Sequence, residues 1–171
     1  MFCLSFLLLL IMSDRVFSTP VEMEDRFCID SKSSLYVHRT QILGIKHLII
    51  DYQVPEYEIK NLSKLKNLLS LKLENGFNFT SERSRRVFFV SLSKLNRLER
   101  LDISNKDFSA RYLKCLPEKL KFLNVSGTTL LPSAIDYLPT SLEEIVISNT
   151  FLNTTMLVES DRFKKLTSII D

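Results

Sequence analysis

The stretch Leu98-Glu99-Arg100-Leu101-Asp102-Ile103 decides the fold, because its spacing of aliphatic residues recurs along the chain. An aliphatic residue is followed by two free positions, a second aliphatic, one free position and usually a third aliphatic. Four other copies and one partial copy begin, in order, at Ile45, Leu68, Leu120, Leu142 and Leu166. Successive starts are 23, 30, 22, 22 and 24 residues apart. A period of this length predicts a solenoid in which each repeat forms one structural unit.

The second half of each copy is predicted to be a short strand, in which alternate side chains point to opposite faces. Leu71 and Leu73 then point inward, and Lys72 points outward. Stacked strands form a parallel sheet whose outward residues line a concave surface. Each buried aliphatic contributes roughly 1.5–3 kcal/mol, so only a stack of units that share one core offsets the ordering entropy of the chain.

From Ile45 to Asp171 the pattern resembles the leucine-rich repeat family. The resemblance implies an α/β fold of about five to six repeats, with a curved parallel sheet on the concave face and short helices or 3-10 turns on the convex face. It also implies asparagines whose amides bond neighbouring backbone from inside, two residues after the last strand aliphatic. Asn75, Asn105 and Asn149 occupy that position, while Gly127 and Tyr52 depart from it.

Two repeats carry a further likeness. The segments Leu116-Pro117-Glu118-Lys119-Leu120 and Leu138-Pro139-Thr140-Ser141-Leu142 resemble the Leu-Pro-x-x-Leu repeats common in effector proteins of pathogens. Proline at a solenoid turn is also simply a way to enter a strand with a fixed φ. Both explanations are open.

The N-terminus predicts a secretory signal peptide over residues 1–18, because an uncharged apolar run over residues 1–12 is followed by Val16-Phe17-Ser18, which ends in a small residue. The alternative is a buried N-terminal helix. Residues 19–44 are predicted to cap the repeats, with Leu35-Tyr36-Val37 as a capping strand, and residues 45–171 to form the repeats, the last of them incomplete. With 45% apolar and 25% charged residues among its 171 residues, the chain has the composition of one globular domain.

Glycosylation sequons support a secreted, extracellular glycoprotein. They fall at Asn61, Asn78, Asn124 and Asn153. A glycan on Asn124 would obstruct the concave surface, so we expect that site to be unmodified. Cys28 and Cys115 permit one disulfide, but three repeats separate them, so a free Cys115 is expected.

The sequence predicts no enzyme, no cofactor and no metal site. His38 and His47 lack neighbouring ligands at metal spacing, and no glycines are spaced as in a phosphate loop. Glu143 and Glu144 are adjacent on a strand and therefore face opposite sides. These acidic residues are expected on the solvated surface.

The 30-residue interval predicts a helix longer than in other repeats. Phe88, Leu92 and Leu95 share one helical face, and Ser81 is suited to cap the N-terminus. On its first turns Arg83, Arg85 and Arg86 form a basic cluster. This cluster could contact an acidic partner or a glycan, or could be a solvated helix face.

The expected function is protein recognition, or glycan recognition, through the outward residues of the sheet. The predicted binding residues, taken repeat by repeat, are His47, Ile49, Asp51, Ser70, Lys72, Glu74, Arg100, Asp102, Ser104, Phe122, Glu144, Val146 and Ser148, with Asn124 and Ser126 on the same face. The alternative is a structural or regulatory solenoid that self-associates through an uncapped C-terminal repeat. The net charge of +3 does not indicate nucleic-acid binding, and no membrane span or anchor is expected.

Overall fold

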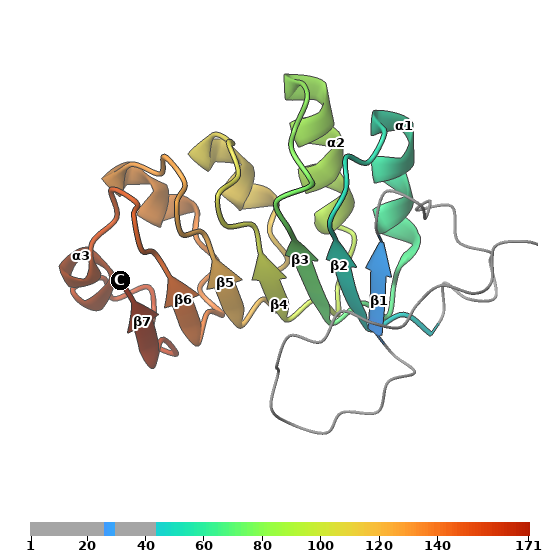
Figure 1. Ribbon diagram of the computed structural model, residues 1–171. Helices are drawn as coiled ribbons and strands as arrows, with labels where there is room; N and C mark the ends of the chain where they lie inside the picture. The colour runs from blue at the N-terminus through green and yellow to red at the C-terminus, as the bar shows by residue number, and fades with distance from the viewer. Residues whose placement is uncertain (1–25, 30–43) are drawn as a thin grey trace, which may run out of the picture.

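The computed structural model describes residues 26–29, of which only the backbone is placed, and residues 44–171. Seven parallel strands form one sheet in which spatial order follows sequence order (Figure 1). The strands are β1 (Arg26–Ile29), β2 (His47–Ile50), β3 (Ser70–Leu73), β4 (Arg100–Asp102), β5 (Phe122–Asn124), β6 (Glu144–Val146) and β7 (Ser168–Ile170). The solenoid predicted from the repeat is therefore confirmed, and each of the six copies supplies one strand.

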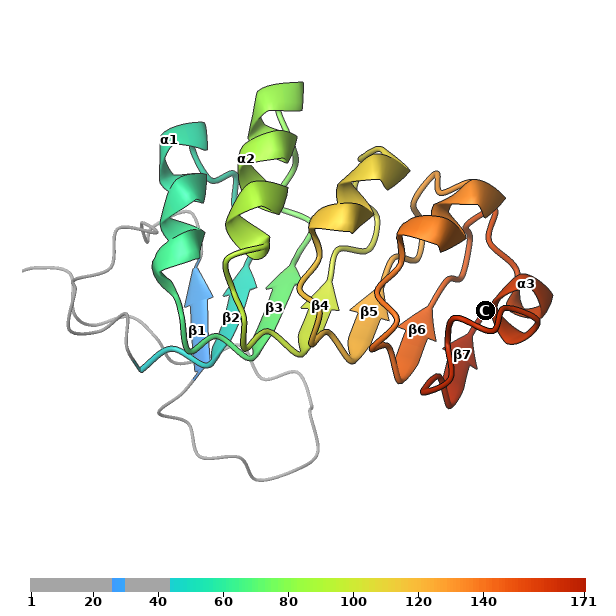
Figure 2. The same cartoon turned by 180° about the vertical axis from the view of Figure 1, so that it is seen from behind.

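Helical segments connect the strands and cover one face of the sheet, leaving the other face without a described helix over it (Figures 1 and 2). They are α1 (Glu56–Ile59), η2 (Lys60–Lys64), α2 (Glu82–Leu92), η3 (Ala110–Cys115), η4 (Pro132–Tyr137) and α3 (Thr154–Val158), where η marks a 3-10 helix. Right-handed crossovers of this kind place each helix on the same side of a parallel sheet. This two-layer arrangement is that of the leucine-rich repeat fold.

The core lies between the two layers and consists of columns of equivalent aliphatic residues. In the central column Leu71, Leu101 and Leu123 lie in register on neighbouring strands and are at most 1% exposed. Their strand neighbours point to the opposite face, as the alternation predicts. Each repeat thus buries its leucines against those of the next, and this stacking stabilises the sheet.

The long interval between the second and third copies contains α2, the longest described helix at 11 residues. The predicted cap is confirmed: the Ser81 hydroxyl accepts a hydrogen bond from the Ser84 amide at 3.0 Å, and the Ser84 hydroxyl in turn accepts one from the Ser81 amide. Phe88 and Phe89 are fully buried and belong to a cluster of aromatic rings that also includes Phe77, Phe79, Phe108 and Tyr112. The extra residues of this repeat therefore form a wider core.

The expected ladder of inward asparagines is wrong. Asn75, Asn105 and Asn149 are exposed, and the latter two adopt left-handed φ values of 56° and 57°. Gly127, which departs from the pattern in sequence, has a φ of 66° and so makes the same turn. Asparagine and glycine are favoured here because they tolerate positive φ, and the position is a turn rather than a buried amide site.

The inward polar position lies one residue further along. Lys106 and Thr128, each 3% exposed, follow the last strand aliphatic by three residues. The Lys106 ammonium donates to the Glu74 carbonyl at 2.8 Å, and the Thr128 hydroxyl donates to the Val125 carbonyl at 2.6 Å. These side chains satisfy backbone carbonyls at the strand ends, the role that sequence analysis assigned to the asparagines.

The N-terminal predictions fall mostly outside the described residues. These include the signal peptide, the strand Leu35-Tyr36-Val37 and His38. Within the predicted capping segment, the strand that pairs with β2 is β1, whose Cys28 lies opposite Ile49. Cys115 has a free, half-buried thiol that packs against the core.

Candidate binding surface

The face of the sheet without a described helix carries two rows of side chains, set by the register of the strands. Within each row the residues of neighbouring repeats lie directly side by side. We call these two rows the open face: the first row is His47, Ser70, Arg100, Phe122, Glu144 and Ser168, and the second is Ile49, Lys72, Asp102, Asn124, Val146 and Ile170. All are at least partly exposed. The structure therefore places the predicted strand residues on one surface.

At the centre of the first row Arg100 stacks on its neighbour Phe122. The guanidinium carbon lies 3.9 Å from the centroid of the ring, and Arg100 is exposed while Phe122 is half-buried. Such a cation–π pair contributes about 0.5–1 kcal/mol at an exposed site and about 2 when a partner excludes water from it. The stacked arginine presents hydrogen-bond donors beside a flat apolar surface.

The second row carries a charged group next to this pair. The Lys72 ammonium and the Glu74 carboxylate form an ion pair of 2.7 Å, with about a third of each side chain exposed (35% and 34%). The hydrogen bond that Lys72 donates to Glu74 raises the pKa of Lys72 above its ordinary value, with smaller contributions from the charges of Asp102 and Asp51. Lys72 therefore stays charged at neutral pH and faces the open side of the sheet.

The predicted residues beyond the strand ends have structural partners. Asp102 accepts a hydrogen bond from the Ser104 amide at 3.0 Å, and Asp51 accepts one from the Gly76 amide at 3.0 Å. The Asn124 side-chain oxygen accepts from both the amide and the hydroxyl of Ser126. Ser104, Ser126 and half-buried Ser148 occupy equivalent positions of successive repeats along the border of the open face, and the bonds at Ser104 and Ser126 hold the turns there.

Sequence analysis missed the contribution of the sixth repeat. Ser168 and Ile170 extend the two rows onto β7, and Ile170 is exposed. The signal was present in the partial copy that begins at Leu166, because alternation along Leu166-Thr167-Ser168-Ile169 places Ser168 outward and requires the same of Ile170.

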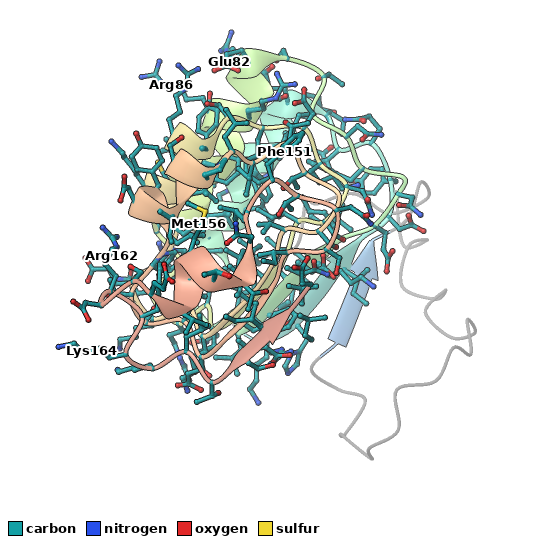
Figure 3. The ribbon with its side chains drawn as sticks, turned by 90° about the vertical axis from the view of Figure 1, so that its left-hand side faces the viewer. Glu82, Arg86, Phe151, Met156, Arg162 and Lys164 are labelled. Carbon is teal, nitrogen blue, oxygen red and sulfur yellow. The ribbon has the colours of Figure 1, made fainter. Side chains whose placement is uncertain are left out.

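The predicted basic cluster on α2 is largely neutralised. Arg85 pairs with Asp107 at 2.5 Å, and Arg83 pairs with Glu56 at 2.9 Å. Glu82 forms an ion pair with Arg111 and accepts a hydrogen bond from the Tyr112 hydroxyl at 2.5 Å, which lowers the pKa of Glu82. These contacts join α2 to the segments before and after it. Arg86 remains exposed on the helix surface (Figure 3).

The four sequons lie in different surroundings. Asn78 is exposed in the irregular segment before α2, and half-buried Asn61 lies in η2. Asn153 caps α3, since its side-chain oxygen accepts from the Met156 amide at 2.9 Å. Asn124 lies in the middle of the open face.

Two observations concern other kinds of site. Among residues 44–171 no three His, Cys, Asp or Glu side chains are grouped so that they could hold a metal ion. In the same part of the chain no helix has the length and apolar character needed to cross a membrane. His47 lies at the start of the first row, at the edge of the open face.

Among known proteins, only solved structures resemble this chain, and they show its fold. No protein-family model matches the sequence, and no curated protein matches it. An internalin from Listeria monocytogenes superposes with a TM-score of 0.51 at 16% sequence identity, over 77% of this chain and 42% of that one. TLR13, in its complex with ssRNA13, gives 0.55 at 20% identity, over 79% of this chain and 20% of that one.

A protein from Bacteroides fragilis gives a TM-score of 0.50 at 19% identity, over 75% of this chain and 41% of that one. The chain thus spans less than half the length of each of these three structures. Internalin and TLR13 are leucine-rich repeat proteins. The likeness in architecture, at this level of identity, assigns the chain the leucine-rich repeat fold.

Proposed function

We propose that this chain is a recognition module that binds a protein ligand on the open face of its sheet, without catalysis. The observation that carries the proposal is the stacked pair of Arg100 and Phe122 at the centre of an exposed, rigid sheet. Arginine and aromatic residues dominate the energetics of protein interfaces when they lie near the centre and are desolvated on binding. This pair has both the chemistry and the position of such a hot spot.

The surroundings of the pair suit a protein surface. Ile49 and Val146 provide partly exposed apolar area on the second row, and Lys72 and Asp102 place opposite charges between them. A mixed surface of this kind gives specificity through charge complementarity and affinity through a few anchors. A glycan is the second ligand class, because aromatic and amide side chains also suit sugar rings.

The proposal extends to secretion. The apolar leader and the sequons support it at the level of sequence, and Asn78 and Asn153 are exposed and lie outside the strands. Asn124 is proposed to be unmodified, because its position is in the centre of the open face, where a glycan would obstruct binding.

Site-directed photo-cross-linking tests the proposed face. A photoreactive residue is placed at Ser70 on the open face or, as the matched control, at Arg86 on α2, and the protein is exposed to extracellular material. We expect one partner to be captured from Ser70, and its capture to be lost in Arg100→Ala/Phe122→Ala. Capture from Arg86 alone, or capture from Ser70 that the double substitution leaves unchanged, would refute the proposed face.

A second candidate function is self-association through the β7 end. Phe151 and Val158 are 64% and 70% exposed, and Ile170 on β7 is 46% exposed. Phe151 is labelled in Figure 3, which views the molecule from this end. Exposed apolar side chains near a sheet edge are typical of an interaction site.

Light scattering separates this candidate from the first. An oligomer that dissociates in Phe151→Ser/Val158→Ser, but not in the control Tyr57→Ser at the opposite end of the solenoid, favours self-association. A monomer at all concentrations removes this candidate and leaves the open face.

A further inference from the structure

The charges of this chain are distributed unevenly between the edges of the sheet. The segments that lead into the strands, residues 44–46, 64–69, 93–99, 116–121, 138–143 and 163–167, lie along the edge where the strands begin (Figures 1 and 2). They hold nine basic and three acidic residues, an excess of six, whereas the remainder of residues 44–171 holds ten basic and twelve acidic residues. The small net charge of the whole chain conceals this separation.

Three of the six excess charges lie in the segments before β3 and β4, and the segment before β7 adds two through Lys164 and Lys165. We call Lys64, Lys66, Lys94 and Arg97 the basic edge; all four are exposed. Lys64 and Lys94 occupy equivalent positions of successive repeats, each just before the first leucine of its segment. Residues 60–67 and 93–98 contain no acidic residue, and Glu99, which follows them, pairs with Lys121.

Contacts between the two repeats hold the basic edge together. The Lys66 ammonium donates to the Lys94 carbonyl at 3.0 Å, and the Arg97 guanidinium donates to the Asn67 side-chain oxygen at 2.9 Å. Both bonds run from one repeat to the next, so the long side chains lie along the edge. Neighbouring strands are about 4.8 Å apart, which brings the charges of adjacent repeats close together.

In the fourth repeat the basic residues are accompanied by acidic ones. Lys121 forms an ion pair with Glu99 at 3.1 Å, and Glu118 is adjacent to Lys119 in sequence. The segment before β6, residues 138–143, contains no basic residue. The basic edge is therefore a local patch, not a property of every repeat.

We propose that the basic edge binds a sulfated polysaccharide. A concentrated row of lysine and arginine attracts a polyanion, and binding releases the counterions of that polyanion. Residues 60–67 and 93–98 contain no aromatic residue on which an unpaired base could stack, so the patch lacks the platform that single-stranded nucleic acids use. None of the exposed large apolar side chains in the described chain lies in these segments, so nothing there inserts into a lipid bilayer.

Heparin serves as the probe for this site. We compare the unsubstituted protein, Lys64→Gln/Lys94→Gln, and the control Arg86→Gln/Lys114→Gln, which removes the same charge from exposed residues of the helical layer. At about 0.15 M salt, where charges on distant faces are screened, we expect the basic-edge variant to bind heparin about tenfold more weakly and the control to change by less than about twofold. The basic-edge variant should also show a smaller salt dependence of its affinity.

Two further measurements distinguish failure of this proposal from failure of the proposed function. Arg100→Ala/Phe122→Ala should retain full heparin affinity, and Lys64→Gln/Lys94→Gln should retain capture of the protein partner. Equal losses in the basic-edge variant and its control would overturn the proposal, as would no binding of heparin by the unsubstituted protein. Tighter binding to single-stranded RNA or to phosphatidylserine vesicles than to heparin would overturn the choice of ligand.

Discussion

Replacing Leu101 by alanine tests whether the stacked repeats share one core. Leu101 is fully buried in β4, in register with Leu71 and Leu123 on the neighbouring strands. The substitution removes the aliphatic contacts and leaves a cavity in the middle of the stack. Substitutions of this kind cost about 2.7–5 kcal/mol, and a central site that cannot collapse lies in the upper part of this range.

Leu166→Ala provides the matched control. Leu166 occupies the first aliphatic position of the sixth copy and is only half-buried. Its replacement by alanine removes the same atoms as Leu101→Ala does. We expect a loss of roughly 1–2 kcal/mol there, because about half of the transfer free energy is involved. Domains of this size are stable by about 5–15 kcal/mol, so the central substitution removes a large fraction of the total.

Urea denaturation followed by far-UV circular dichroism measures both losses. The two variants should have similar slopes and different midpoints, with Leu101→Ala the lower by a wide margin. If Leu166→Ala destabilises the protein as much as Leu101→Ala does, the central column is not the main source of stability and the reasoning is refuted.

Further predictions concern the turns, the helix contacts and the sequons. Gly127→Ala should lower the free energy of unfolding by about 1–2 kcal/mol in the same urea assay, because φ is 66° and the new Cβ would lie 2.1 Å from the Asn105 side-chain oxygen; an unchanged midpoint would contradict this. The lowered pKa of Glu82 means that the folded state releases its proton more readily than the unfolded state, so the stability from Glu82 is present above its ordinary pKa and is lost as pH falls through the lowered value. The difference in urea midpoint between the unsubstituted protein and Glu82→Gln should therefore shrink between pH 6 and about 3, and a constant difference would argue against the contact with Tyr112. In protein secreted from a glycosylating host, the Asn78 peptide should change mass after deglycosidase treatment and the Asn124 peptide should not; a shift at Asn124 would contradict the proposed use of the open face.

The architecture could be predicted because it depends on local periodicity. The aliphatic spacing around Leu71 and Leu101 specifies which side chains face inward, and parallel stacking follows from the need to bury them. The helix cap at Ser81 was equally local, since it needs only residues three positions apart. Such features require no knowledge of distant contacts.

The incorrect predictions concern asparagine, a residue type that suits both a buried amide site and a turn with positive φ. Asn105 and Asn149 were expected to be buried because asparagine is common inside such solenoids, but their positive φ shows that backbone conformation selected them. The inward polar position is held instead by Lys106, whose long side chain reaches the Glu74 carbonyl from another repeat. Residue type alone would not place a lysine at a buried position, because burial of an ammonium group is usually unfavourable.

Contacts between repeats could not be read from the sequence. The partners of Arg83 and Arg85 lie 27 and 22 residues away, Glu56 before and Asp107 after them, so the cluster had the composition of a basic patch. The basic edge was missed for the opposite reason. Lys64, Lys66, Lys94 and Arg97 are spread over two repeats, and only the superposition of the repeats brings their charges together.

The affinity of the captured partner for purified variants tests the central claim most directly. By isothermal titration calorimetry, Arg100→Ala/Phe122→Ala should bind the partner at least about 30-fold more weakly, as expected when a central hot spot of roughly 2 kcal/mol or more is removed. Arg86→Gln/Lys114→Gln should bind within about twofold of the unsubstituted protein. Equal affinities for the open-face variant and the unsubstituted protein would contradict the assignment of the open face as the binding surface.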